Sequence, residues 1–148
     1  MSGYKTVVVG TDGSASSLRA VDRAAQLASD PDAKLILVTA FIHGPEDTRA
    51  QDVLKDESYK ATGSGPAYQI LQDARDRAVA AGAAHVEERA VEGAPVDVLV
   101  DLVAEVKADL LVVGNLGLSS IAGRLLGSVP ANVARRTTSD VLIVHTTG

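Results

Sequence analysis

A glycine-rich segment that follows the apolar run ADLLVV has the composition of a phosphate-binding loop. The residues that set its spacing, G-x-x-G-x9-G-S, are Gly114, Gly117, Gly127 and Ser128. Glycine lets backbone N–H groups approach a phosphate closely where a side chain would block them, and a following helix adds a favourable dipole. The segment 114–130 contains no lysine and only one arginine, Arg124. Any anion bound here would therefore be held mainly by N–H groups.

A second loop of small residues, GTDGS at 10–14, follows the first apolar run and contains Gly10, Thr11 and Asp12. Its backbone N–H groups are also expected to reach an anion. The sequence has neither GxxxxGK[ST] nor GxGxxG after this run, so those phosphate motifs are excluded. Simpler roles stay open: Asp12 as a helix cap, Arg124 as a solvated side chain, and the glycines as turn residues.

Continuous apolar runs rich in β-branched residues predict strands that are buried on both faces of a parallel sheet, at 6–10, 35–40, 110–114 and 141–145. A more polar run, 85–91, predicts a strand at the sheet edge. Helical patterns separate the strands, over 14–29, 66–83, 94–109 and 128–136. This alternation predicts an α/β fold built from βαβ units, in one domain over residues 1–148.

Fold logic places the two loops together, because ligands of open parallel sheets bind beyond the carboxyl ends of the strands, where the winding reverses. The irregular stretch 43–65 is long for a connection between a strand and a helix. Two interpretations of it remain open: a solvated surface insert, and a lid over a site.

Bulk composition excludes several functional classes. The chain has 148 residues, a formal net charge of −5 and no cysteine, which argues against general nucleic-acid binding and excludes disulfides and thiolate metal sites. Only 3% of residues are aromatic, so the core must consist of aliphatic side chains. No apolar run approaches the roughly 20 residues of a membrane helix. We therefore expect a soluble, cytoplasmic protein with no membrane partner.

The glycine spacing, VVGTDGS at 8–14 and DVLIVH at 140–145 together resemble the universal stress protein family, over essentially the whole chain. The resemblance implies an open five-stranded parallel sheet in the order 3-2-1-4-5, with helices on both faces, as in adenine nucleotide alpha hydrolase-like folds. It implies a homodimer that pairs through the last strand, 140–146. It also implies the nucleotide-binding branch, since other members lack the glycine motif.

The same resemblance assigns roles by position. Asp12 and the backbone near Ala40 would serve the adenine and ribose. The positions that would line the phosphate loop or hold phosphate oxygens are Val113, Gly114, Gly117, Gly127, Ser128 and Val129. Gly10 departs from the pattern, because many relatives have proline there, and the 43–65 insert matches no family signature.

These observations favour a non-enzymatic sensor or reservoir of ATP, or of an adenine monophosphate such as cAMP, with no catalytic residue. A slow ATPase or phosphotransferase is one alternative, although the loop offers few groups to stabilise a transferring phosphoryl group. An interaction module with a vestigial pocket is another, and the intact glycine spacing argues against it. In an acidic protein, ATP is expected to depend on Mg²⁺, with Asp12 at most an indirect ligand, whereas a monophosphate avoids that cost.

Overall fold

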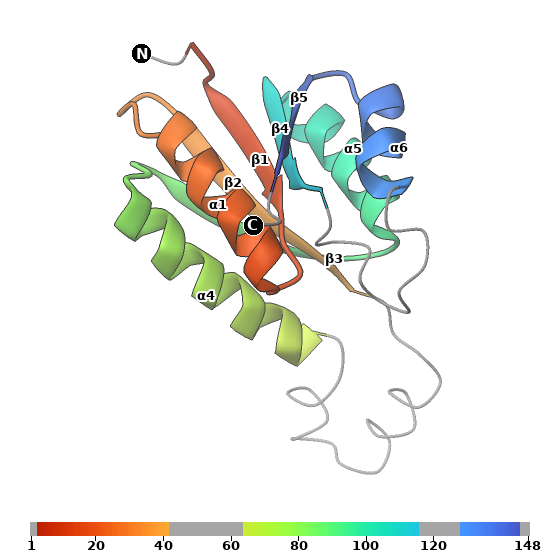
Figure 1. Cartoon of the computed structure of the whole chain (residues 1–148), viewed down its shortest axis with the longest axis horizontal. Helices are drawn as coiled ribbons and strands as arrows, with labels where there is room; N and C mark the ends of the chain where they lie inside the picture. Colours follow the sequence, from red (N-terminus) through yellow and green to blue (C-terminus); the bar gives the residue numbers. More distant parts are fainter. Residues whose placement is uncertain (1–2, 42–63, 116–127, 146–148) are drawn as a thin grey trace.

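A computed structural model describes residues 3–41, 64–115 and 128–145. Its strands form one parallel sheet in the order β3-β2-β1-β4-β5 (Figure 1). They are β1 (Thr6–Gly10), β2 (Lys34–Phe41), β3 (Val86–Glu92), β4 (Leu110–Gly114) and β5 (Asp140–Val144). The described helices are α1 (Ala15–Leu27), α4 (Ser64–Ala81), α5 (Pro95–Val106) and α6 (Ser128–Arg136). The predicted fold class and strand order are confirmed.

The predicted elements are found with small shifts at their ends. Helix α4 starts at Ser64, two residues before the predicted Pro66. Helix α5 ends earlier than expected because Lys107 adopts a left-handed conformation, with φ 56°, and its N–H donates to the Val103 carbonyl. Apart from residues 64 and 65, the 43–65 insert lies outside the described residues, so neither interpretation of it is tested.

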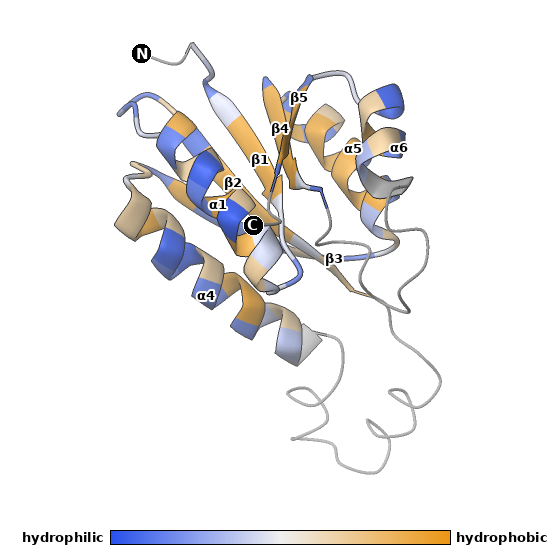
Figure 2. Cartoon of the chain, viewed as in Figure 1, coloured by the Kyte–Doolittle hydropathy of each residue, from blue (hydrophilic) through white to orange (hydrophobic). Residues whose placement is uncertain are grey.

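The core lies in two layers, one on each face of the sheet. Helices α1 and α4 cover one face and α5 and α6 the other (Figure 1). Along β1, Val7 and Val9 face the first pair of helices and Val8 faces the second, and all three are fully buried. Every buried hydrophobic side chain in the described part of the chain is Val, Leu, Ile or Ala, as the composition predicted. In Figure 2 the central strands are mostly coloured as hydrophobic, whereas the helices alternate between hydrophobic and hydrophilic positions.

The two edges of the sheet differ in chemistry. On β3, Glu87 bonds to both Lys34, at 3.2 Å, and Arg89, at 2.7 Å. The hydrogen bond from Arg89 lowers the pKa of the Glu87 carboxyl below its ordinary value. On β5, by contrast, Ile143 is 42% exposed and its neighbours Val141 and Leu142 are only partly buried. One edge strand is therefore charged and the other apolar.

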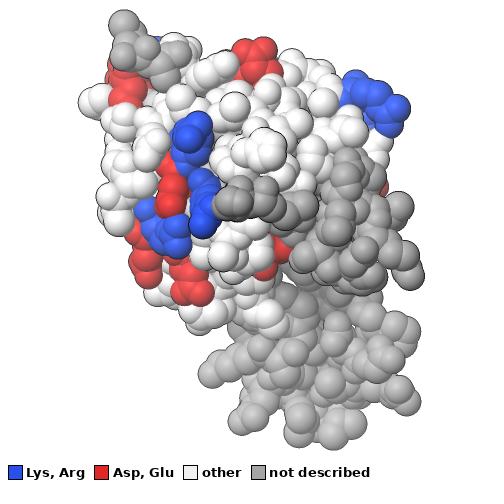
Figure 3. Space-filling view, in the orientation of Figure 1, with Lys and Arg blue, Asp and Glu red and all other residues white. Residues whose placement is uncertain are grey.

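Charges on the helical surface alternate in sign. Arg77 of α4 forms a bidentate ion pair with Asp22 of α1, with Nη2 2.6 Å from Oδ2. On the face shown in Figure 3, basic and acidic side chains are interleaved over these two helices. Among the described residues, no helix has the length and apolarity needed to cross a bilayer.

Candidate functional site

The connections between strands change direction at the boundary between β1 and β4. From β1 the chain moves outward through β2 to β3, with α1 and α4 on one face. It then crosses back through α5 to β4, which pairs with β1 on its other side. Helix α1, which follows β1, packs on one face of the sheet, and α6, the next described helix after β4, packs on the other. In open parallel sheets, the ligand crevice is expected at the carboxyl edge between two such strands. The two loops that the sequence predicted as ligand-binding are the ones that follow β1 and β4.

The loop after β1 holds Asp12 in a fixed conformation. The Thr11 N–H donates to the Val38 carbonyl of β2 at 3.0 Å, which extends the strand pairing by one residue. The Asp12 carboxylate accepts the Ser14 N–H at 2.9 Å, and the Ser14 hydroxyl accepts the Ser17 N–H at 3.1 Å as the N-cap of α1. Asp12 is partly buried and lies two residues beyond Gly10, the last residue of β1.

The N–H groups of this loop are occupied within the protein. The Asp12 N–H donates to the Ser17 hydroxyl at 3.3 Å, and the Gly13 N–H donates to the Thr11 hydroxyl at 3.1 Å. With those of Thr11 and Ser14, four consecutive N–H groups have internal acceptors. The expectation that this loop offers N–H groups to an anion is therefore not met. The ionisable side chain of this loop is the Asp12 carboxylate.

An apolar recess lies beside this loop. Its floor is formed by Gly10, Val38 and Ala40 at the ends of β1 and β2. The first turns of α5 supply its wall, through Pro95, Val98 and Leu99. The sequence predicted a helix over 94–109 but did not assign these α5 residues to the site. The order of the elements could have indicated them, because a helix that follows β3 must begin at the same carboxyl edge of the sheet as the recess.

The other side of the crevice is formed by β4 and α6. Val113 and Gly114 end β4 and are buried. Ser128 and Val129 are the first two residues of α6. Helix α6 leads from the carboxyl end of β4 to the amino end of β5, so its N-terminus lies at the carboxyl edge of the sheet. A helix dipole favours an anion there. The remaining predicted positions, Gly117, Arg124 and Gly127, lie outside the described residues.

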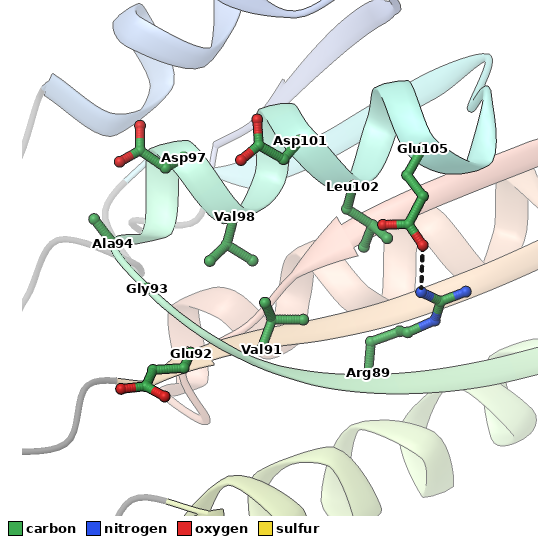
Figure 4. A pocket seen from close by; sticks show the side chains of 10 residues that line it. All are labelled: Arg89, Val91, Glu92, Gly93, Ala94, Asp97, Val98, Asp101, Leu102 and Glu105. Atoms are coloured by element: carbon green, nitrogen blue, oxygen red, sulfur yellow. Dashed lines mark hydrogen bonds and ion pairs between the residues drawn. The ribbon is translucent and has the colours of Figure 1, made fainter.

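A larger cavity, of about 180 Å³, lies between β3 and α5 and does not suit an anion. Val91, Val98 and Leu102 point toward one another across it, while Asp97 and Asp101 point away from it on α5 (Figure 4). Its lining includes four carboxylates and one cation, Arg89, which is bonded to Glu105 at 3.3 Å. This excess of negative charge would repel a phosphate.

Metal binding has little support in the described residues. Within them, no group of three or more His, Asp or Glu side chains is placed to hold an ion. Asp12 is the one carboxylate that we place in the crevice. A divalent ion there would need most of its ligands from a bound phosphate or from water, as Mg²⁺ commonly does.

Comparison with known proteins gives the family. The family model described as "Universal stress protein family" matches residues 3–145. The chain belongs to the universal stress protein family. The universal stress protein Rv1636 of Mycobacterium tuberculosis is 70% identical over 147 residues, which cover 99% of this chain and all of the relative.

Two solved structures share the fold of this chain. One universal stress protein, solved in complex with cAMP, is 69% identical, has a TM-score of 0.74, and matches over 97% of this chain and 99% of its own. The protein MJ0577 is 21% identical with a TM-score of 0.76, over 98% of both chains. At that identity, MJ0577 supports the fold alone.

Gly13, in the first loop of this universal stress protein, leaves little room for a side chain beside α4. It has a φ of +85°, and a Cβ atom placed on it would lie 3.1 Å from Cγ1 of Ile70. This proximity could not be predicted from the sequence, because Ile70 follows the insert and its position depends on how α4 lies against α1. The contact makes the loop sensitive to the position of α4.

We expect Gly13→Ala to lower the free energy of unfolding by about 1–2 kcal/mol through the left-handed conformation, with a further cost from Ile70. In an Ile70→Ala background the same change should cost less, because the tight contact is gone. Chemical denaturation of the four proteins in this double-mutant cycle measures the difference. An equal cost in both backgrounds would show that Ile70 does not restrict a side chain at position 13.

Proposed function

We propose that this chain binds an adenine nucleotide in the crevice between β1 and β4 and acts as its sensor or reservoir. The nucleotide would be ATP or an adenine monophosphate such as cAMP. The observation that carries the proposal is the 69% identical universal stress protein solved in complex with cAMP. The geometry supports it with an apolar recess, a partly buried carboxylate and a helix N-terminus at one edge of the sheet.

The parts of the crevice suit different parts of a nucleotide. The recess by Gly10 and Ala40, at about 10 Å³, is too small to enclose a base, so a base would rest on the apolar surface around it. The Asp12 carboxylate can accept hydrogen bonds from ribose hydroxyls. The phosphate then belongs on the β4 and α6 side, because the N–H groups from Thr11 to Ser14 are already bonded. In this arrangement the phosphate lies away from the Asp12 charge.

Replacement of Asp12 tests the site. We expect Asp12→Ala to weaken binding of cAMP or AMP about tenfold, equivalent to ~1.4 kcal/mol, because a ribose acceptor is lost. Asp30→Ala is a matched control: its Oδ1 accepts the Asp32 N–H at 2.9 Å in the same kind of turn, at the amino edge of the sheet. Isothermal titration calorimetry measures both. Equal affinity in the Asp12 variant and the wild type would place the site elsewhere.

The charge of the ligand decides which nucleotide binds without metal. The acidic protein opposes an anion, so ATP should bind markedly more weakly once Mg²⁺ is removed with a chelator. AMP or cAMP should bind at least as tightly as metal-free ATP and be insensitive to Mg²⁺. Titration of ATP, ADP, AMP and cAMP with and without Mg²⁺ tests this, and product analysis separates storage from slow hydrolysis. Tight metal-free binding of ATP alone would contradict the expectation.

We also propose that two copies pair through the β5 edge. This strand pairs with β4 on one side only, and Ile143 is 42% exposed on it. An apolar edge strand of this kind invites pairing with another chain. The charged β3 edge is much less suited to such pairing.

Ile143→Lys is therefore expected to convert a dimer to monomers or aggregates, since a buried lysine at the interface would lack a partner. Val79→Lys places the same charge on α4, at a side chain that is 57% exposed, and should leave the assembly unchanged. Light scattering after size exclusion, at micromolar concentration, measures the mass of each protein. A monomeric wild type would rule out the dimer.

A further inference from the structure

We propose that Thr11 and Ser17 are positioning residues of the nucleotide site, because their buried hydroxyls fix both peptide groups that flank Asp12. Both side chains are fully buried, with no exposed area. Their oxygens lie 2.8 Å apart. This inference rests on the proposed function, since it concerns how Asp12 is held toward a ligand.

The other hydrogen bonds of the two hydroxyls determine which one donates to the other. The Ser17 hydroxyl donates to the Ser14 carbonyl at 3.0 Å, which uses its one hydrogen. The Thr11 hydroxyl must therefore donate to Ser17. Each oxygen then still accepts one backbone N–H, from Gly13 for Thr11 and from Asp12 for Ser17. Every hydrogen in this small network has an acceptor.

The two accepted N–H groups belong to consecutive peptide units. The N–H of Asp12 orients the peptide between Thr11 and Asp12, and the N–H of Gly13 orients the next one. Because peptide units are planar, fixing both leaves the Asp12 backbone little freedom to rotate. The carboxylate is in turn bonded to the Ser14 N–H. The direction of the Asp12 side chain is thus set by hydroxyls that do not reach solvent.

Helix capping does not account for the Ser17 hydroxyl. The N-cap of α1 is Ser14, whose hydroxyl accepts the Ser17 backbone N–H. That bond needs no hydroxyl on Ser17. The Ser17 side chain instead makes its contacts with Thr11, Asp12 and Ser14, all in the loop or at its junction with the helix. Loss of this hydroxyl should therefore alter the loop more than the helix.

Two substitutions at Thr11 separate the hydroxyl from the packing. Thr11→Val keeps the shape and removes the hydroxyl, whereas Thr11→Ser keeps the hydroxyl and removes a methyl group. Ser17→Ala removes the other hydroxyl. Thr137→Val is a matched control, because the Thr137 hydroxyl lies 3.1 Å from that of Ser139 and accepts the Ser139 N–H at 3.3 Å, before β5 at the opposite edge.

Amide hydrogen exchange by NMR, without ligand, tests the network directly. Thr11→Val should raise the exchange rate of the Gly13 amide, and Ser17→Ala that of the Asp12 amide, each about tenfold, corresponding to ~1.4 kcal/mol. Calorimetry with cAMP and AMP then tests the role. Both variants should bind roughly fivefold more weakly, while Thr11→Ser and Thr137→Val should stay within about twofold of the wild type.

The outcomes separate this inference from the proposed function. Unchanged exchange of the two amides would overturn it, because the hydroxyls would not fix the loop. Faster exchange with unchanged affinity would also overturn it, as would a Thr11→Ser variant that binds as weakly as Thr11→Val. A wild type that binds none of the adenine nucleotides would instead overturn the proposed function, whatever the exchange rates show.

Discussion

Burial of β1 on both faces is the constraint on which the rest of the structure depends. This strand lies between β2 and β4 and is covered by helices on each side, so Val7, Val8 and Val9 have no contact with water. Polar side chains can therefore reach a ligand only beyond the end of this strand, at Gly10. Because the strands are parallel, β4 meets the same limit at Gly114 on the same edge. The crevice follows from these two endings.

The two sides of the crevice offer opposite kinds of polar group. On the β1 side, the Thr11 and Ser17 hydroxyls accept loop N–H groups, so the group that we propose for contact with a ligand there is an acceptor, the Asp12 carboxylate. On the other side, the first N–H groups of α6 have no acceptor within their own helix. A ligand with hydroxyls at one end and a phosphate at the other would meet both requirements. An adenine nucleotide has this arrangement.

The sequence predicted the sheet well because double-sided burial leaves a direct trace, a continuous apolar run such as that of β1 or β4. It also placed Asp12 and Gly114 at one edge, since parallel strands end together. It could not show that the Thr11 and Ser17 hydroxyls accept hydrogen bonds from the loop N–H groups. These bonds depend on the direction in which α1 leaves the strand. The contact of Ile70 with Gly13 and the α5 wall of the recess were missed for a similar reason. They arise between elements that are distant in sequence.

The ion pairs of β3 also bear on how many copies of the sheet can join. If β5 of one molecule met β3 of the next, the contact would be head-to-tail and would repeat into a filament unless the rotation closed it into a ring. Such a contact would require Glu87 and Arg89 to lose water and to loosen their bonds with Lys34 and Glu105. The apolar edge lacks this obstacle, so like edges can meet through a twofold axis. Charge on one edge strand thus favours a closed assembly of few copies over a filament.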